Sequence, residues 1–349
     1  MTIDAIPAGA PARASGPGVW HGSELGEPSK WVRMLNGEQI RDLNRAIKQV
    51  ESQGLDIDEI DATRFALPSW TELIREVRHE LRRGRGFVLL RGVPVEDYSY
   101  QQSRIAFWGI GAQIGPGLTQ SARADLVCDI TDRNESLQKL ERTYATTQGL
   151  DFHCDFPDIV GLLCLRTAAK GGGSHITSSG AVYNALLDRR PDLMPHLLNG
   201  FPWDRRNEHG DGEAPIGPRI PVFRDIHGVI HCRYGKGSIL AAAQRAGVPL
   251  SPAEREAVEL VNITAADPEL VLTMDFRPGD VQLLNNYLIL HARAAYEDHP
   301  EPEKKRHLLR LWLEDDGYRY VNHEPNIRYG VLRYGRLGLR ADELRAEAG

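Results

Sequence analysis

Long hydrophobic runs, cysteine-rich motifs and an excess of positive charge are all missing from this sequence. No segment approaches the roughly 18 apolar residues of a membrane-spanning helix, so we expect no membrane partner. The cysteines form no C-x-x-C pair, which is typical of reduced thiols in a cytoplasmic protein: Cys128, Cys154, Cys164 and Cys232. A net charge of −6 at pH 7 argues against a general nucleic-acid-binding protein.

The chain has 349 residues, which is enough for one large domain or two ordinary ones. Residues 1–19 are rich in Ala, Pro and Gly and lack the features of a signal peptide, so we expect a disordered tail there. We predict a single domain over residues 20–349, because candidate ligands in its two halves have to meet in space. Between those halves, about residues 175–265, we expect an insert of helices and loops.

Helices and strands are predicted from the spacing of apolar residues. Helical spacing covers residues 37–53, 69–83, 100–114, 179–198 (a pair broken at Pro191) and 251–265. Ser69 and Ser251 are expected to cap the second and the last of these helices. Strands are expected over residues 87–90, 220–223, 229–234, 270–276 and 280–284. Because strands and helices do not alternate regularly, the pattern predicts an α+β fold rather than a doubly wound sheet.

One His-x-Asp pair stands directly before a predicted strand. His153 and Asp155 precede the apolar, β-favouring run 159–165. In a strand, residues i and i+2 share a face, so this pair can bind one metal ion, while Cys154 points to the opposite face. The other His-x-acid pairs lie in stretches broken by Gly or Pro, which predicts surface loops: His209 with Asp211, and His299 with Glu301.

A second histidine completes a possible ligand set. His291 ends the apolar segment 287–290, which follows the turn signal 277–280. Taken alone, such a histidine is more often a hydrogen-bonded core residue than a metal ligand. Two imidazoles and one carboxylate, however, are the ligand set of non-haem Fe(II) oxygenases, which leaves coordination positions open for chemistry.

Two arginines are predicted to point into the interior. From Arg306 onward, strand alternation places Arg306, Leu308, Arg310 and Trp312 on one face and His307, Leu309, Leu311 and Leu313 on the other. A buried guanidinium is costly unless it is paired. Internal salt bridges would satisfy both arginines. The alternative is that at least one of them binds an anionic ligand, such as the carboxylate of a 2-oxo acid.

Together these motifs resemble those of the Fe(II)/2-oxoglutarate-dependent dioxygenases of the taurine-dioxygenase (TauD/TfdA) and clavaminate-synthase-like family. That family has His-x-Asp/Glu, a long insert, a distal His and then one or two Arg. Here Arg306 follows His291 by fifteen residues, and Arg310 comes four residues later. The family's small hydroxyl residue after a Gly-Gly turn is matched by Ser174, and its early core strand by residues 86–94. The resemblance covers roughly residues 70–320.

The resemblance implies a distorted double-stranded β-helix, a jelly-roll-type sandwich, with Fe(II) held by His153, Asp155 and His291. It also implies 2-oxoglutarate as cosubstrate, held by Arg306 with the Ser174 hydroxyl, and O2. The implied reaction is hydroxylation, desaturation or ring closure at an unactivated C–H bond, with release of succinate and CO2. Halogenation is not expected, because family members that halogenate have a small residue at the position of Asp155.

The substrate is not identified by any motif. A small carboxylate-bearing metabolite is the expected class, with these candidate contacts: Arg310, Arg233, Tyr234, Tyr144 and Thr146. The protein could also form a homo-oligomer. Two other functions remain open. One is a cupin-type enzyme with the same metal ligands that does not use 2-oxoglutarate, which would leave Arg306 without a function. The other is a non-catalytic protein that binds small molecules on the same fold.

Overall fold

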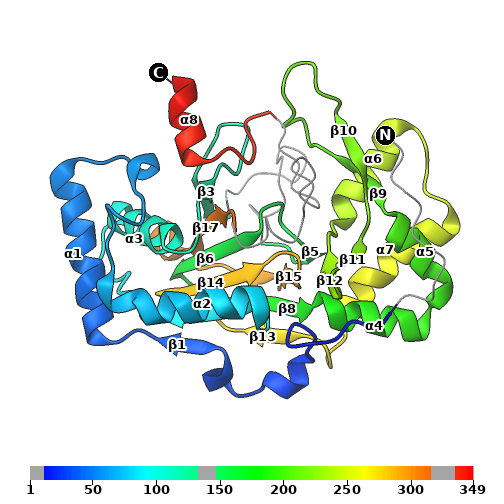
Figure 1. The fold of residues 1–349 in the computed structure, drawn as a ribbon, viewed down its shortest axis with the longest axis horizontal. Coiled ribbons are helices and arrows are strands. Elements are labelled where there is room, and N and C mark those ends of the chain that lie inside the picture. Colours follow the sequence, from blue (N-terminus) through cyan, green and yellow to red (C-terminus); the bar gives the residue numbers. More distant parts are fainter. Residues whose placement is uncertain (1–11, 133–146, 316–334, 349) are drawn as a thin grey trace.

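The computed structural model describes residues 12–132, 147–315 and 335–348, and two β-sheets lie at its centre (Figure 1). The larger sheet has the order β1 (Val32–Met34), β2 (Phe87–Arg91), β14 (Asp280–Asn285), β6 (Ile159–Arg166), β17 (His307–Leu313) and β3 (Gly117–Leu118), with β4 (Val127–Ile130) also paired to β17. The smaller sheet has the order β13 (Leu272–Met274), β8 (Ser174–Ser178), β15 (Ile289–Arg293) and β5 (Leu150–His153). Apart from the parallel pair β1–β2, neighbouring strands of both sheets run antiparallel, so the α+β prediction is confirmed.

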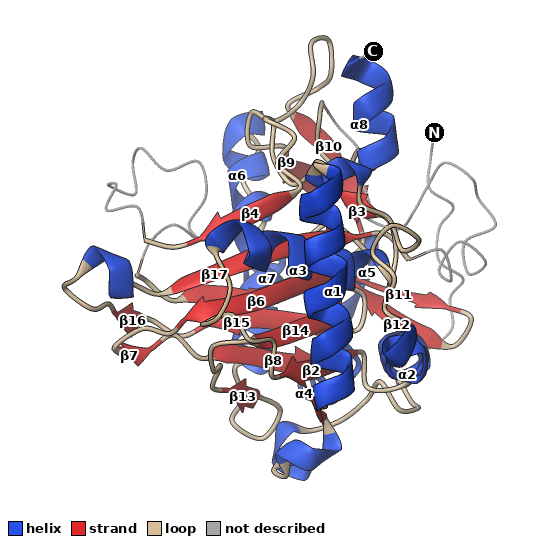
Figure 2. Cartoon of the chain, turned by 90° about the vertical axis from the view of Figure 1, so that its left-hand side faces the viewer, coloured by secondary structure: helices blue, strands red, loops and turns tan. Residues whose placement is uncertain are grey.

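Three helices cover the outer face of the larger sheet (Figure 2): α1 (Gly37–Gln53), α2 (Thr71–Arg83) and α3 (Tyr100–Ala112). The bounds of α1 match the prediction because both of its ends carry local signals. Asn36 accepts hydrogen bonds from the first-turn amides, and Gly54 ends the helix in the left-handed region at φ 62°. Leu309, Leu311 and Leu313 of β17 pack into the core beneath these helices, as strand alternation predicts.

The predicted cap of α2 is wrong. A 3-10 turn over Pro68–Trp70 precedes the helix, which then begins at Thr71. The amide of Ser69 donates to the Asp42 carboxylate (2.8 Å), and the Ser69 hydroxyl has no hydrogen-bond partner among the described residues. A side chain 27 residues away therefore replaces the local cap.

The segment between β8 and β13 forms a second helical layer with its own hydrophobic core, on the right in Figure 1. It contains α4 (Ser179–Arg189), α5 (Met194–Asn199), β9 (Phe201–Asp204), β10 (Ile216–Ile220), β11 (Phe223–Ile226), β12 (Val229–Cys232), α6 (Lys236–Ala246) and α7 (Pro252–Ala265). The break at Pro191 and the Ser251 cap of α7 are both confirmed. The strands predicted over 220–223 and 229–234 correspond to β11 and β12, which pair as a hairpin, but Ile220 belongs to β10.

Segments near both ends of the chain contact this framework. Residues 12–19 lie within the segment predicted as a tail, and they contact β8 and α4: the Ser178 hydroxyl donates to the Gly18 carbonyl (2.6 Å), and the Ala14 amide donates to the Asn184 side-chain oxygen (2.9 Å). The short strands β7 (Lys170–Gly171) and β16 (Tyr296–Glu297) pair beside the smaller sheet, and α8 (Ala341–Ala348) lies at the C-terminal end of the described chain. Within the described residues, no helix is both long and apolar enough to cross a membrane.

Candidate active site

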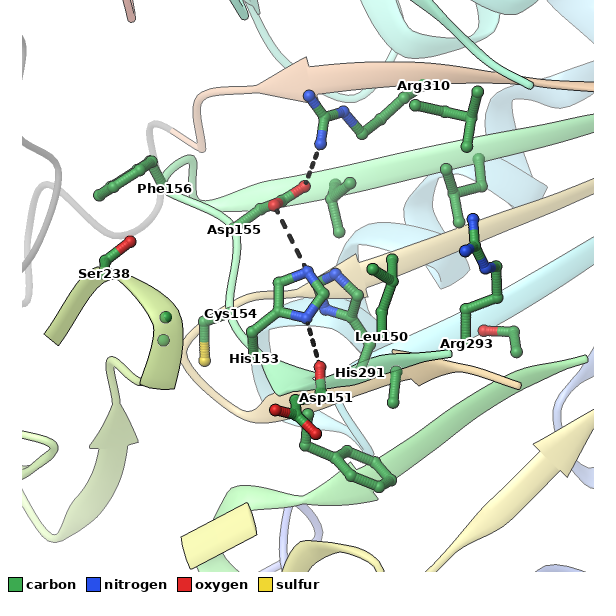
Figure 3. Close-up of a pocket in the computed structure, with 18 of the residues that line it drawn as sticks. Leu150, Asp151, His153, Cys154, Asp155, Phe156, Ser238, His291, Arg293 and Arg310 are labelled. Atoms are coloured by element: carbon green, nitrogen blue, oxygen red, sulfur yellow. Dashed lines mark hydrogen bonds and ion pairs between the residues drawn. The ribbon is translucent and has the colours of Figure 1, made fainter. Parts of the chain in front are cut away.

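The smaller sheet brings the two predicted histidines together. His153 at the end of β5 pairs in register with His291 on β15, and their ring centroids lie 4.3 Å apart. Asp155 follows two residues after His153. One possible ligand atom from each of the three side chains lies within 4.8 Å of the others. Figure 3 shows the two imidazoles side by side, with the Asp155 carboxylate facing them.

The remaining histidines and cysteines that the sequence singled out lie outside this cluster. His209 and His299 are loop residues, as predicted. The Cys154 sulfur points away from the imidazole rings (Figure 3) and lies within 3.8 Å of the Cys232 carbonyl oxygen. Among the described residues, only His153, Asp155 and His291 form a group of this kind.

The electrostatics of the cluster suit a divalent cation. Desolvation lowers the pKa of His291 to about 3, so its imidazole is neutral near pH 7 and keeps a lone pair for a metal. Burial alone would raise the pKa of Asp155. The positive charge of Arg310 is the main cause that holds the pKa of Asp155 below its ordinary value instead. His153 Nδ1 donates to the Asp151 carbonyl oxygen (2.8 Å), which leaves its Nε2 for the cluster.

Arg310 and Trp312 both reach Asp155 from β17. The Asp155 Oδ2 atom accepts hydrogen bonds from Trp312 Nε1 (3.0 Å) and Arg310 Nη1 (3.3 Å). Arg310 Nε donates to the Gln120 side-chain oxygen (2.8 Å). Of the two predicted interior arginines, Arg310 is therefore the one that forms an internal salt bridge.

Arg306 lies in a different environment, just before β17. Only 4% of its surface is exposed, it makes no ion pair with a described carboxylate, and its Nη1 atom has no hydrogen-bond partner among the described residues. Burial lowers the pKa of Arg306. Gly172, at φ 75°, passes so close that a Cβ atom there would come within 3.0 Å of Arg306 Nε. The glycine turn is thus needed to fit the guanidinium.

A cavity of about 530 Å³ is lined by His153, Asp155 and His291, which we call the triad, and also by Arg306. Ser174 on β8 lines the same cavity and accepts a hydrogen bond from the Gln282 amide nitrogen (3.0 Å). Arg293 was not predicted from the sequence; it pairs in register with Ser174 across β8 and β15 and lines the cavity too. Arg293 and Arg306 both lie against the Tyr296 ring, at 4.9 and 5.1 Å from its centroid. Burial and then the charge of Arg306 lower the pKa of Arg293 to about 10.

Strand alternation contained a signal for Arg293, because it stands two residues after His291 and therefore on the same strand face. Other polar and aromatic residues of the cavity carried no such signal, because they come from β9, the loop after it and α6 in the segment between β8 and β13, or from the loop after β5: Phe156, Trp203, Arg206, Lys236 and Ser238.

Of the predicted substrate contacts, only Arg310 lines the cavity among the described residues. Arg233 is buried and donates to the Asp155 and Pro157 carbonyl oxygens (2.7 and 3.4 Å), so it braces the loop that carries Asp155. The Tyr234 hydroxyl donates to the Val258 carbonyl oxygen (2.8 Å) in the second core. Tyr144 and Thr146 lie outside the described residues.

A model of the taurine catabolism dioxygenase TauD, TfdA family matches residues 48–312 of this chain. The chain belongs to that family. As a TauD/TfdA-family protein it is an Fe(II)- and 2-oxoglutarate-dependent dioxygenase, so the enzyme class inferred from the motifs is confirmed.

Two relatives align with most of the chain. FR-33289 synthase of Streptomyces rubellomurinus is 29% identical over 323 residues, which cover 91% of this chain and 95% of that protein. The taurine hydroxylase-like protein SAT17 of Stachybotrys chartarum is 31% identical over 312 residues, which cover 85% of this chain and 79% of that protein.

Solved structures support the fold. Asparagine oxygenase in complex with Fe(II), 2S,3S-3-hydroxyasparagine and succinate superposes with a TM-score of 0.66 at 18% identity, covering 84% of this chain and 97% of that one. The oxygenase OrfP with Fe and alpha-ketoglutaric acid gives a TM-score of 0.60 at 14% identity, covering 86% and 99%. These likenesses confirm the predicted double-stranded β-helix of this TauD/TfdA-family protein.

Proposed function

We propose that His153, Asp155 and His291 hold the iron of this dioxygenase, and that Arg306 with Ser174 binds 2-oxoglutarate. The proposal rests on a single cavity whose two ends have different chemical groups. One end has two imidazoles and a carboxylate, and the other has a buried guanidinium with a nitrogen that lacks a partner among the described residues.

The donor set fits Fe(II). Two imidazole nitrogens and one carboxylate oxygen can occupy one side of an octahedral ion and leave positions for the cosubstrate and O2. The buried His291 Nδ1 has no hydrogen-bond partner among the described residues, as expected for a ring placed to bind something other than protein. When bound, Fe(II) with 2-oxoglutarate and O2 supplies the oxidising power that breaks an unactivated C–H bond, and succinate and CO2 are released.

Arg306 suits the distal carboxylate of the cosubstrate. Its planar guanidinium can donate two parallel hydrogen bonds to a carboxylate, and burial strengthens that contact. Arg306 stands just before β17 and Arg310 lies four residues further along the extended chain, which separates their Cα atoms by about 13 Å. Arg310 contacts Asp155 and so marks the metal-binding end of the cavity. An elongated dicarboxylate bound between the metal and Arg306 would therefore extend along the chain from Arg310 toward Arg306.

For the substrate we propose a small metabolite with an anionic group, such as an amino acid. The cavity wall near the triad combines aromatic rings with Ser238, Lys236 and Arg206. The Arg206 guanidinium donates to the Ser238 hydroxyl (3.0 Å), and Lys236 forms ion pairs with Asp151 (2.8 Å) and Glu259 (3.3 Å). Structures of relatives include complexes with hydroxyasparagine and with L-Arg, which are amino acids.

A cytoplasmic location and homo-oligomer formation stay predictions.

Spectroscopy under anaerobic conditions tests the metal and cosubstrate assignments. Fe(II) together with 2-oxoglutarate should give a weak visible charge-transfer band in the wild type, and the band should be missing when His291 is replaced by Ala. A cupin-type enzyme that does not use 2-oxoglutarate would bind iron without developing the band. A non-catalytic protein would release no succinate with any compound.

A panel of amino acids and other small carboxylates, scored by substrate-dependent succinate release, tests the proposed substrate class. Compounds that differ only in the presence of the anionic group form matched pairs within the panel. Equal succinate release from both members of every active pair would contradict an anionic substrate.

A further inference from the structure

The two oxygen atoms of the Asp155 carboxylate have different surroundings. Oδ2 accepts hydrogen bonds from Trp312 Nε1 and Arg310 Nη1, at 3.0 and 3.3 Å. Oδ1 lies 3.9 Å from His153 Nε2 and accepts no hydrogen bond from a described residue. We infer that Trp312 is a positioning residue, which turns the carboxylate so that one oxygen faces the metal. The inference rests on the proposed role of the triad.

Trp312 is held too firmly for its N–H group to swing away from Asp155. Only 2% of its surface is exposed, and its strand β17 pairs with β6 on one side and β3 on the other. The indole packs edge-on against Phe156, with ring centroids 6.4 Å apart, and the Arg310 guanidinium lies 4.9 Å from the indole centroid. The donor is therefore in place before a metal binds, and the carboxylate does not need to be ordered by the ion itself.

Replacing Trp312 tests the orientation of the Asp155 carboxylate without changing the charge beside it. Arg310 contributes a positive charge to Asp155 as well as a hydrogen bond, so its replacement changes both. The indole N–H is neutral, and its removal takes away only the directed hydrogen bond. Partners that orient a metal ligand in this way are typically worth about 10- to 100-fold in metal affinity.

The chain offers a matched control in Trp203. It lines the same cavity, is 4% exposed, and packs edge-on against Phe156 with ring centroids 5.6 Å apart. Its Nε1 atom, however, has no hydrogen-bond partner among the described residues. Replacing either tryptophan with Phe removes the same atoms from the cavity wall, but only the change at position 312 removes a hydrogen bond to Asp155.

The test is Co(II) binding to the metal-free, full-length protein, measured by titration calorimetry together with the visible spectrum of the bound Co(II). Trp312→Phe should bind Co(II) about 10- to 100-fold more weakly than the wild type. Its spectrum should also change, because a carboxylate that is free to turn coordinates differently. Trp203→Phe should retain the wild-type affinity and spectrum. Wild-type affinity and spectrum in Trp312→Phe would overturn the inference.

Two further measurements separate the possible failures. If His291→Ala binds Co(II) as the wild type does, the proposed metal site is wrong, and the role of Trp312 falls with it. If His291→Ala loses binding while Trp312→Phe does not, only the present inference fails. Should Trp312→Phe not fold, benzothienylalanine at position 312 keeps the shape of the indole and puts sulfur in place of N–H. Unchanged Co(II) affinity in that protein would likewise overturn the inference.

Discussion

At the end of the cavity near the triad, Arg310 is neutralised by Asp155, whereas at the opposite end Arg306 makes no ion pair with a described carboxylate. Both arginines line the same cavity and are almost equally buried, with Arg310 7% and Arg306 4% exposed. What differs is the chain that lies opposite. The loop after β5 brings a carboxylate to Arg310, while β8 and β15 bring Ser174 and Arg293 to the region of Arg306.

We call the end of the cavity with the paired Arg310 the preorganised end, and the end with Arg306 the receptive end. A buried cation without an acidic partner costs stability, and proteins keep such groups chiefly where function needs them. At the end near Arg310, the guanidinium is paired with a carboxylate of the protein itself. The end near Arg306 has two neighbouring guanidiniums against one tyrosine ring, which an anionic ligand would stabilise.

The largest effect is expected at the triad. His291→Ala removes a proposed ligand, which should weaken iron binding by more than about 100-fold, since even partners of metal ligands are worth 10- to 100-fold. Iron content after dialysis and substrate-dependent succinate release measure the two consequences. His299→Ala, in a loop outside the cluster, should retain both. Full activity in the His291 variant would show that the proposed site is wrong.

The next effect concerns stability at the preorganised end. Asp155→Ala removes the carboxylate that pairs with the buried Arg310 guanidinium. Breaking such a pair typically costs about 3–5 kcal/mol, so thermal denaturation of the metal-free variant should show a clear loss. Asp151→Asn, at an exposed ion pair with Lys236, should cost about 1 kcal/mol or less. Equal stability of the two variants would mean that the Arg310 pair contributes little.

A smaller effect is expected at the receptive end. Arg306→Lys should raise the KM for 2-oxoglutarate by about 10- to 100-fold, because an ammonium cannot replace a planar fork of charge-assisted hydrogen bonds. Arg310→Lys should act instead on metal binding or on the coupling of 2-oxoglutarate consumption to product formation. Initial rates at varied 2-oxoglutarate decide between them. Loss of cosubstrate affinity in the Arg310 variant alone would reverse the assignment.

The smallest effect is expected at Ser174. Ser174→Ala removes one neutral hydroxyl donor, worth about 1 kcal/mol, so the KM for 2-oxoglutarate should rise by about fivefold. Ser174→Thr keeps the hydroxyl and should stay near the wild type in the same assay. Identical KM values for the Ala variant and the wild type would remove the hydroxyl from the cosubstrate site.

Several elements were predictable from the sequence because their signals are local. The bounds of α1 depend on Asn36 and Gly54, which flank it directly, and the start of α7 depends on the Ser251 cap. The prediction at Ser69 failed because Asp42, distant in sequence, accepts the hydrogen bond of its amide. Local signals therefore predict an element well only when no tertiary partner competes for the same backbone groups.

By itself, the sequence determined the class of the enzyme and pointed to the three residues that we propose as metal ligands. His153 and Asp155 have the His-x-Asp spacing of the family, although Asp155 lies in the loop after β5 and not on the strand itself, and His291 and the two arginines follow at intervals typical of the family. Only the tertiary structure decided which arginine is paired, that Arg233 braces a loop, and that Arg293 and Trp312 line the cavity. The physical reason is that burial and charge pairing depend on which strands become neighbours, and the spacing of residues along one strand contains no information about the side chains opposite it.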